Sequence, residues 1–203
     1  MTAPTIWTKP DVMTRIVAGL ARGRRLTVAR GEVTRPTSDR AREALFSTLD
    51  GLVSLRGAHA LDLYAGSGAL GLEAMSRGAA HALFVESDRR AAATLRTNID
   101  AVALDGAVLV LSAVERLAAT APESTPGSAS PYDLVFADPP YRLAAVELSD
   151  ALANLHGRGW LAPRAVVVVE RSVRDDPWVW PTPLETIRDR RYGEAVLWYG
   201  RAP

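Results

Sequence analysis

From about residue 58 onward, short apolar runs alternate with stretches that have helical periodicity. The candidate strands are residues 58–64, 81–86, 107–111, 134–137, 165–170 and 194–199. The candidate helices between them are residues 68–77, 88–102, 113–119 and 143–157. Strands that are apolar on both faces and separated by helices are typical of a parallel sheet covered on both sides. The pattern therefore predicts an α/β, doubly wound fold.

The first part of the chain has a different pattern. Residues 13–33 interleave apolar side chains with glycines and arginines, which predicts a β-hairpin that buries little by itself. A break at residues 34–38 is followed by a helix that Thr37 or Ser38 can cap. We predict a basic N-terminal arm at residues 1–36, with the main domain at residues 37–203.

Charge is distributed unevenly along the chain. Residues 1–42 hold nine basic and three acidic side chains, a net charge of +6, which leaves −5 for the rest of a chain whose total is +1. A basic end on a nearly neutral domain favours contact with a phosphate backbone, although arginines also serve simply to solvate a surface. The candidate RNA-contacting residues are Arg15, Arg22, Arg24, Arg25, Arg40 and Arg42.

Composition narrows the class of protein. With 203 residues, 48% of them hydrophobic, the chain is long enough for one well-buried core. It has no run of eighteen apolar residues and a charged N-terminus, so we expect no membrane span and a cytoplasmic location. The absence of cysteine excludes disulfides, thiolate metal sites and cysteine nucleophiles. The histidines are scattered singly and predict no metal site: His59, His81 and His156.

A glycine-rich loop follows the first candidate strand. Gly66 and Gly68 allow a ligand to approach the backbone closely, and the next helix offers free N–H groups. A tight turn or a nicotinamide-binding loop would look much the same. Asp62 favours a ligand that carries an ammonium group over one that carries a pyrophosphate. The candidate ligand-binding residues here are Asp62, Tyr64, Ala65, Gly66, Ser67 and Gly68.

The second candidate strand ends at Glu86, about twenty residues after the first glycine of the loop. The two oxygens of a carboxylate match the two vicinal hydroxyls of a ribose. Glu86, with Ser87 beside it, therefore predicts binding of an adenosine-containing cofactor. Asp88 serves equally well as a helix cap.

The fourth candidate strand runs into Asp138-Pro139-Pro140-Tyr141. The prolines stop the strand abruptly because they restrict the backbone and cannot donate hydrogen bonds. Asp138 and the carbonyl of Pro139 can then accept both N–H groups of an exocyclic amine, while Tyr141 stacks on a flipped base. Such positioning suits direct methyl transfer, for which no covalent enzyme nucleophile is required.

On these residues the chain resembles the class I methyltransferases of the amino type, and within them the RsmD family of 16S ribosomal RNA guanine-N2 methyltransferases. The segments that carry the resemblance are Arg15-Ile16-Val17-Ala18-Gly19, Arg35-Pro36-Thr37-Ser38-Asp39-Arg40-Ala41-Arg42-Glu43-Ala44-Leu45-Phe46, residues 62–71, residues 138–141 and Arg191-Tyr192-Gly193-Glu194. The resemblance implies a Rossmann-like, mostly parallel seven-stranded sheet with an antiparallel last strand. It also implies S-adenosylmethionine as cofactor, and ribosomal RNA or the assembling small ribosomal subunit as partner of a monomeric, metal-free enzyme.

The same resemblance implies roles for single residues. It places Arg35, Pro36 and Thr37 over the methionine end of the cofactor, with the glycine loop beneath it and Glu86 on the ribose. Such proteins often carry an acid near the adenine amine, but here the matching residues are Ser112, Ala113 and Val114. We therefore expect backbone contacts from Ala113 or Val114 to recognise the adenine.

Three other functions compete with this interpretation. DNA adenine-N6 methylation uses the same Asp-Pro-Pro-Tyr motif, but an arm of about forty residues is small for reading a DNA sequence. A nicotinamide-dependent oxidoreductase would share the glycine loop and would have no use for Asp138 and its neighbours. A catalytically inactive nucleic-acid-binding protein would not need the glycine loop, Glu86 and residues 138–141 together.

Overall fold

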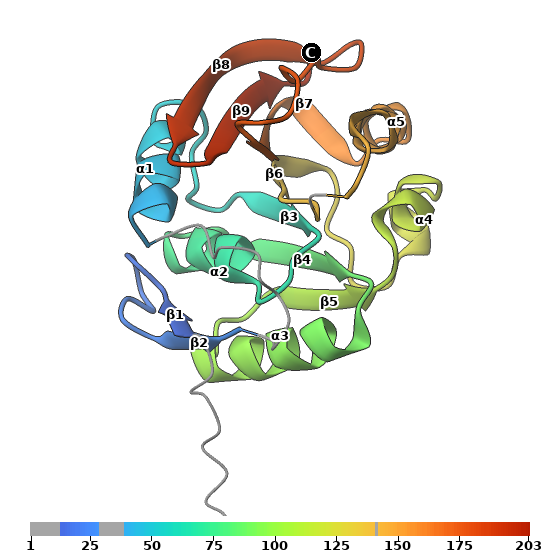
Figure 1. The fold of residues 1–203 in the computed structure, drawn as a ribbon. Coiled ribbons are helices and arrows are strands. Elements are labelled where there is room, and N and C mark those ends of the chain that lie inside the picture. Colours follow the sequence, from blue (N-terminus) through green and yellow to red (C-terminus); the bar gives the residue numbers. More distant parts are fainter. Residues whose placement is uncertain (1–12, 29–38, 141) are drawn as a thin grey trace, which may run out of the picture.

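The computed structural model describes residues 13–28, 39–140 and 142–203. Among the described residues, seven strands form one sheet in the order β5-β4-β3-β6-β7-β9-β8, which rises from β5 to β8 in Figure 1. Their bounds are β3 (His59–Leu63), β4 (His81–Glu86), β5 (Ala107–Leu111), β6 (Tyr132–Ala137), β7 (Leu161–Ser172), β8 (Glu185–Tyr192) and β9 (Ala195–Arg201). The strands from β5 to β7 pair in parallel, whereas β9 runs antiparallel to both of its neighbours. The predicted sheet, including its antiparallel last strand, is confirmed.

Helices cover both faces of the sheet, as Figure 1 shows. On one face lie α1 (Asp39–Leu49), α2 (Ala69–Ser76) and α3 (Arg89–Val102), and on the other lie α4 (Val114–Ala118) and α5 (Ala145–Gly157). The start of α3 illustrates how the sequence sets these bounds. The Asp88 side chain accepts hydrogen bonds from the backbone N–H groups of Arg90 and Ala91, at 2.8 and 2.9 Å. None of the described helices has the length and apolarity needed to cross a bilayer.

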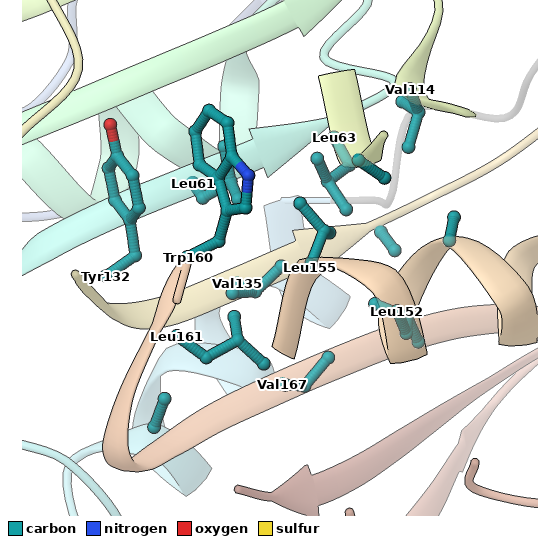
Figure 2. Close-up of a cluster of buried hydrophobic side chains, with 14 of the residues drawn as sticks. Leu61, Leu63, Val114, Tyr132, Val135, Leu152, Leu155, Trp160, Leu161 and Val167 are labelled. Atoms are coloured by element: carbon teal, nitrogen blue, oxygen red, sulfur yellow. The ribbon is translucent and has the colours of Figure 1, made fainter. Parts of the chain in front are cut away.

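Two cores result from the alternation of side chains along the central strands. Leu61 and Leu63 face α4 and α5, while Ala60, next to Leu61 on the same strand, faces the helices on the other side. Figure 2 shows the first of these clusters, in which the rings of Tyr132 and Trp160 stack with 6.1 Å between their centroids. Residues that alternate between two buried faces explain why these strands are apolar throughout.

The described part of the N-terminal arm is a two-stranded hairpin, formed by β1 (Met13–Arg15) and β2 (Arg25–Thr27). It lies against α2 and α3 (Figure 1). Ile16 and Leu26 are fully buried, and they belong to the same cluster as the apolar residues of α2 and α3. The hairpin therefore buries its apolar side chains by packing on the main domain.

Two elements differ from the periodicity. Strand β8 was not among the candidate strands, because its sequence ETIRDRRY is polar and its side chains are mostly exposed. As an edge strand it has only one hydrogen-bonded neighbour, and its two faces do not both need to be buried. Strand β7 begins four residues earlier than predicted, through an irregularity in its pairing with β6.

Candidate active site

The registers of three parallel strands bring the predicted site residues to one edge of the sheet. Leu63 on β3 pairs with Val85 on β4 and with Ala137 on β6. The residues that follow, among them Glu86 and Asp138, therefore lie level at the carboxyl edge. Neighbouring strands are about 4.8 Å apart, so the backbones at these two positions are roughly 10 Å from each other. This is also where consecutive crossovers change faces, the place at which open α/β sheets bind ligands.

The loop after β3 is a tight, left-handed turn. Gly66 and Gly68 have φ angles of +53° and +79°, and Tyr64 adopts φ +56° despite its side chain. A Cβ atom on Gly68 would lie only 2.3 Å from Cδ1 of Leu95. The Gly68 N–H donates to the Ala65 carbonyl at 2.7 Å. Glycine at position 68 is thus required by both backbone conformation and the approach of α3.

Asp62 lies buried beneath this loop. Its Oδ2 accepts a hydrogen bond from the Gly71 N–H at 2.8 Å, and the residue is only 2% exposed. Burial raises the pKa of Asp62 to about 8, with the opposing effect of the Gly71 hydrogen bond and a further increase from Glu86. A nearby cation would favour the ionised form of this carboxyl group, and its affinity for an ammonium group stays a prediction.

Glu86 is held in one orientation by the backbone around it. Its two carboxylate oxygens accept hydrogen bonds from the N–H groups of Gly66 and Asp88, at 2.9 and 2.7 Å. Each oxygen has a second lone pair, which leaves the pair able to accept two ribose hydroxyls. Ser87 beside it is exposed. The residues present at this edge therefore fit an adenosine-containing cofactor.

The segment after β6 contains the predicted acceptor-binding residues. Asp138 is half-buried and Pro139 is buried, and a turn closes with the Leu143 N–H donating to the Pro140 carbonyl at 2.8 Å. The anchor of this turn was not predicted from the sequence: Arg171 donates from Nη1 to the Leu143 carbonyl at 3.1 Å. The predicted residues that lie outside the described part of the chain are Arg35, Pro36, Thr37 and Tyr141.

The edge of the site at β5 leads into α4. Val114 is buried, whereas Ala113 is half-buried at the helix start. Glu115 one residue later is exposed and accepts a hydrogen bond from the Tyr64 hydroxyl at 3.2 Å. Burial and this carboxylate raise the pKa of Tyr64 well above its ordinary value. Glu115 is thus an acid near the expected adenine end. It follows the three positions, 112–114, where related proteins often carry one.

A buried carboxylate on α2 holds the arm in place. Glu73 has no exposed surface, and its two oxygens accept hydrogen bonds from the N–H groups of Val17 and Ala18, at 2.7 and 2.9 Å. It also forms ion pairs with Arg77 at 2.8 Å and Arg42 at 3.6 Å. The one acid in an otherwise apolar helix is a sequence signal that could have identified this anchor.

The prediction that Arg42 contacts RNA is wrong. Its side chain is 1% exposed and donates hydrogen bonds to the Thr14 hydroxyl, the Arg15 carbonyl and the Asp39 carboxylate. Burial lowers the pKa of Arg42, an effect that Glu73 and Asp39 oppose. A guanidinium in this position fixes the arm to α1 and cannot reach a phosphate. The other five candidate arginines are exposed: Arg15, Arg22, Arg24, Arg25 and Arg40.

Asn98 is a second residue that the sequence analysis missed. It is 1% exposed and lies on the buried stripe of α3, where its neighbours on the helix are Leu95 and Val102. Its side chain forms hydrogen bonds with Thr27 of the arm and with Ser67 of the glycine loop. A polar residue at an apolar position of the helical pattern is the signal that could have found it.

Comparisons with known proteins bear on this site. A family described as "Conserved hypothetical protein 95" matches residues 14–201. "Ribosomal RNA small subunit methyltransferase D" of Escherichia coli (strain K12) is 38% identical over 161 residues, which cover 79% of this chain and 76% of that protein. The protein of the same name from Haemophilus influenzae is 35% identical over 182 residues, which cover 88% and 89% of the two chains.

Solved structures agree with the sequence relatives. A structure described as "Putative methyltransferase yhhF from Escherichia coli" has a TM-score of 0.79 and 35% identity, and the match covers 94% of this chain and 98% of that one. Since the family match spans almost all of the described residues and the curated relatives align along most of both chains, the chain belongs to the RsmD family, whose matched members are named ribosomal RNA small subunit methyltransferase D.

Proposed function

We propose that the protein transfers a methyl group from S-adenosylmethionine directly to the exocyclic N2 amine of a guanine in small-subunit ribosomal RNA. The observation that carries the proposal is the placement of Asp138 at the carboxyl edge of the sheet, level with Glu86 and beside the glycine loop. With these roles, a cofactor-binding edge and an amine-binding segment would lie next to each other. The names of the relatives support ribosomal RNA as the substrate class.

The cofactor would be held by residues from three strand ends. Residues 66–68 would lie beneath it, Glu86 would accept the ribose hydroxyls, and Asp62 would face the ammonium group. The backbone of Ala113 and Val114 would contact the adenine. By resemblance, residues 35–37 would cover the methionine end. When bound, S-adenosylmethionine supplies a methyl group that is already activated by the sulfonium.

The acceptor amine would be positioned by the segment after β6. The lone pair of an aromatic amine is delocalised into its ring, so the amine becomes a better nucleophile when its two hydrogens are held by acceptors. Asp138 and the Pro139 carbonyl would take these two hydrogen bonds, while Tyr141 would stack on the base. The amine nitrogen would form the new N–C bond as the methyl–sulfur bond breaks and leaves its electron pair on sulfur. The amine would then lose one proton, for which the Asp138 carboxylate would be the adjacent acceptor.

The arm would supply the contacts with the RNA backbone. Arg22, Arg24 and Arg25 are exposed on the hairpin, and Arg15 remains 66% exposed despite its ion pair with Asp39 at 3.0 Å. Arginines on one protruding element can contact phosphates without reading a sequence. The chemistry of base selection would then rest with the segment after β6.

The test is a methyl-transfer assay with S-adenosylmethionine that carries an isotopic label in its methyl group. The substrates are small-subunit ribosomal RNA and assembled small subunits from cells lacking the gene, with double-stranded DNA as a parallel substrate. Nucleoside mass spectrometry should find labelled N2-methylguanosine in the RNA. Label in N6-methyladenine of the DNA, or no transfer to any substrate, would overturn the proposal.

A further inference from the structure

The amide of Asn98 connects two segments that lie far apart in the sequence. Its Oδ1 accepts a hydrogen bond from the Thr27 N–H at 2.9 Å. Its Nδ2 donates to the Thr27 carbonyl at 2.9 Å and to the Ser67 carbonyl at 2.8 Å. Two of these partners are carbonyl groups and one is an N–H group, so only one orientation of the amide satisfies all three.

At the arm, Asn98 pairs with both the N–H and the carbonyl of one strand residue. Thr27 is the last residue of β2. Its N–H and carbonyl point away from β1 and would be unpaired without Asn98. The amide side chain acts here as a neighbouring strand would. The position of β2 is therefore fixed relative to α3.

At the glycine loop, the same amide fixes one peptide group. The carbonyl of Ser67 is held by Asn98, and the N–H of the following Gly68 is held by the Ala65 carbonyl at 2.7 Å. Both ends of this peptide are thus occupied, and it cannot rotate without breaking a hydrogen bond. Leu95, three residues before Asn98 on α3, fills the space against Gly68.

Within the described part of the arm, the other side-chain anchors lie on α1 and α2 and not in the glycine loop. Glu73 and Ser76 on α2 hold the arm at residues 17–21. Among the residues that the structure describes, Asn98 is the side chain whose hydrogen bonds reach both the arm and the glycine loop. It therefore links the two segments directly.

We infer that Asn98 is a positioning residue that couples the glycine loop to the arm, so that cofactor binding and RNA binding strengthen each other. The inference rests on the proposed function, which assigns the cofactor to the loop and RNA to the arm. Ordering of the loop by the cofactor holds Ser67, and through Asn98 it holds β2 in the position from which the arm contacts RNA. Coupling of this kind is reciprocal and typically changes affinity by about fivefold or more.

The first test uses the unmodified protein and needs no RNA. Hydrogen–deuterium exchange is followed by mass spectrometry with and without saturating S-adenosylhomocysteine. If S-adenosylhomocysteine slows exchange in peptides from the glycine loop, it should also slow exchange in peptides that contain residues 25–27. Protection of the loop with unchanged exchange in residues 25–27 would overturn the inference and leave the proposed function intact. Failure of the protein to bind S-adenosylhomocysteine would instead overturn the proposed function.

The second test separates coupling from a merely structural role. The affinity for a fluorescein-labelled fragment of small-subunit ribosomal RNA is measured with and without S-adenosylhomocysteine, for the wild type and for Asn98→Ala. In the wild type, S-adenosylhomocysteine should increase the RNA affinity about fivefold or more. In Asn98→Ala, the ratio of the two affinities should be near one. A structural role would weaken the separate affinities and leave the ratio unchanged, which would refute the inference.

A matched control is available on the same helix. Thr97 is exposed, and its hydroxyl donates to the Ala93 carbonyl within α3, so Thr97→Ala should keep the wild-type ratio. Should Asn98→Ala fail to fold, Asn98→Asp keeps the side-chain shape and the acceptor for Thr27 while removing both donors. The exchange experiment on the wild type decides the inference independently of either variant.

Discussion

Binding of S-adenosylmethionine should release a proton from Asp62. The carboxyl group is buried, and burial raises its pKa to about 8. It is therefore largely neutral at pH 7 in the cofactor-free protein. An ammonium group beside it stabilises the carboxylate form, so the bound state should carry an ionised Asp62.

The size of the effect follows from this pKa. A group with a pKa of about 8 is roughly 90% protonated at pH 7, so complete ionisation on binding releases about 0.9 of a proton. At pH 9 the same group is already mostly ionised, and the release should fall to about 0.1. Cofactor affinity should accordingly increase with pH between about 6 and 8, because the proton competes with the ammonium group.

The assay is isothermal titration calorimetry at pH 7 in phosphate and in Tris, buffers with different ionisation enthalpies. The slope of the observed enthalpy against the ionisation enthalpy gives the number of protons released. Asp62→Asn serves as the control, since it keeps the shape and cannot titrate, and it also cancels protons exchanged by the cofactor's own amine. An equal slope for the wild type and Asp62→Asn would refute the assignment of the ammonium group to Asp62.

Three further predictions concern the arm, its anchor and the turn after β6. Replacing Arg22, Arg24 and Arg25 by alanine should reduce the salt dependence of RNA binding by about 2 in the log–log slope, since each phosphate contact on single-stranded RNA contributes roughly 0.7. Glu73→Gln should lower the unfolding free energy by about 3 kcal/mol, measured by urea denaturation, because it leaves Arg42 buried without its full countercharge. Arg171→Ala should reduce kcat about tenfold while leaving cofactor affinity unchanged, since it removes a charged hydrogen bond worth roughly 1.5 kcal/mol.

The arm variant has a matched control, and each of the three predictions has a result that would contradict it. Three exposed arginines away from the arm, replaced together by alanine, should leave the slope nearly unchanged: Arg56, Arg116 and Arg158. An arm variant with unchanged salt dependence would remove the arm from the RNA interface. Wild-type stability in Glu73→Gln would show that the buried cluster is not an anchor. For Arg171, a weaker cofactor affinity at unchanged kcat would contradict its assigned place beside the acceptor.

Buried strands and strand ends could be predicted because their chemistry is local. The apolar runs of β3, β4 and β6 follow from burial on both faces, and the polar residues that end them mark the carboxyl edge. In a parallel sheet all such ends meet at one edge, so Glu86 and Asp138 could be brought together without a structure. The polar edge strand β8 carried no such signal.

Long-range polar contacts could not be predicted in the same way. Arg42 was counted with the exposed arginines because a charge count does not distinguish a buried guanidinium from a solvated one. Its partner Glu73 lies 31 residues further along the chain, and Asn98 lies 71 residues from Thr27. Glu73 and Asn98 both lie on apolar faces of their helices. This position indicates that each has a buried polar partner but does not identify the partner. The fold is needed to identify which backbone groups they bind.

The most direct test of the account measures turnover and cofactor affinity together in Asp138→Ala. Single-turnover methyl transfer to small-subunit ribosomal RNA is followed with labelled S-adenosylmethionine, and the cofactor's Kd is determined by calorimetry on the same preparation. We predict that methyl transfer is abolished while the Kd stays close to that of the wild type. Transfer at the wild-type rate would contradict the claim that the carboxylate at position 138 holds the amine for attack.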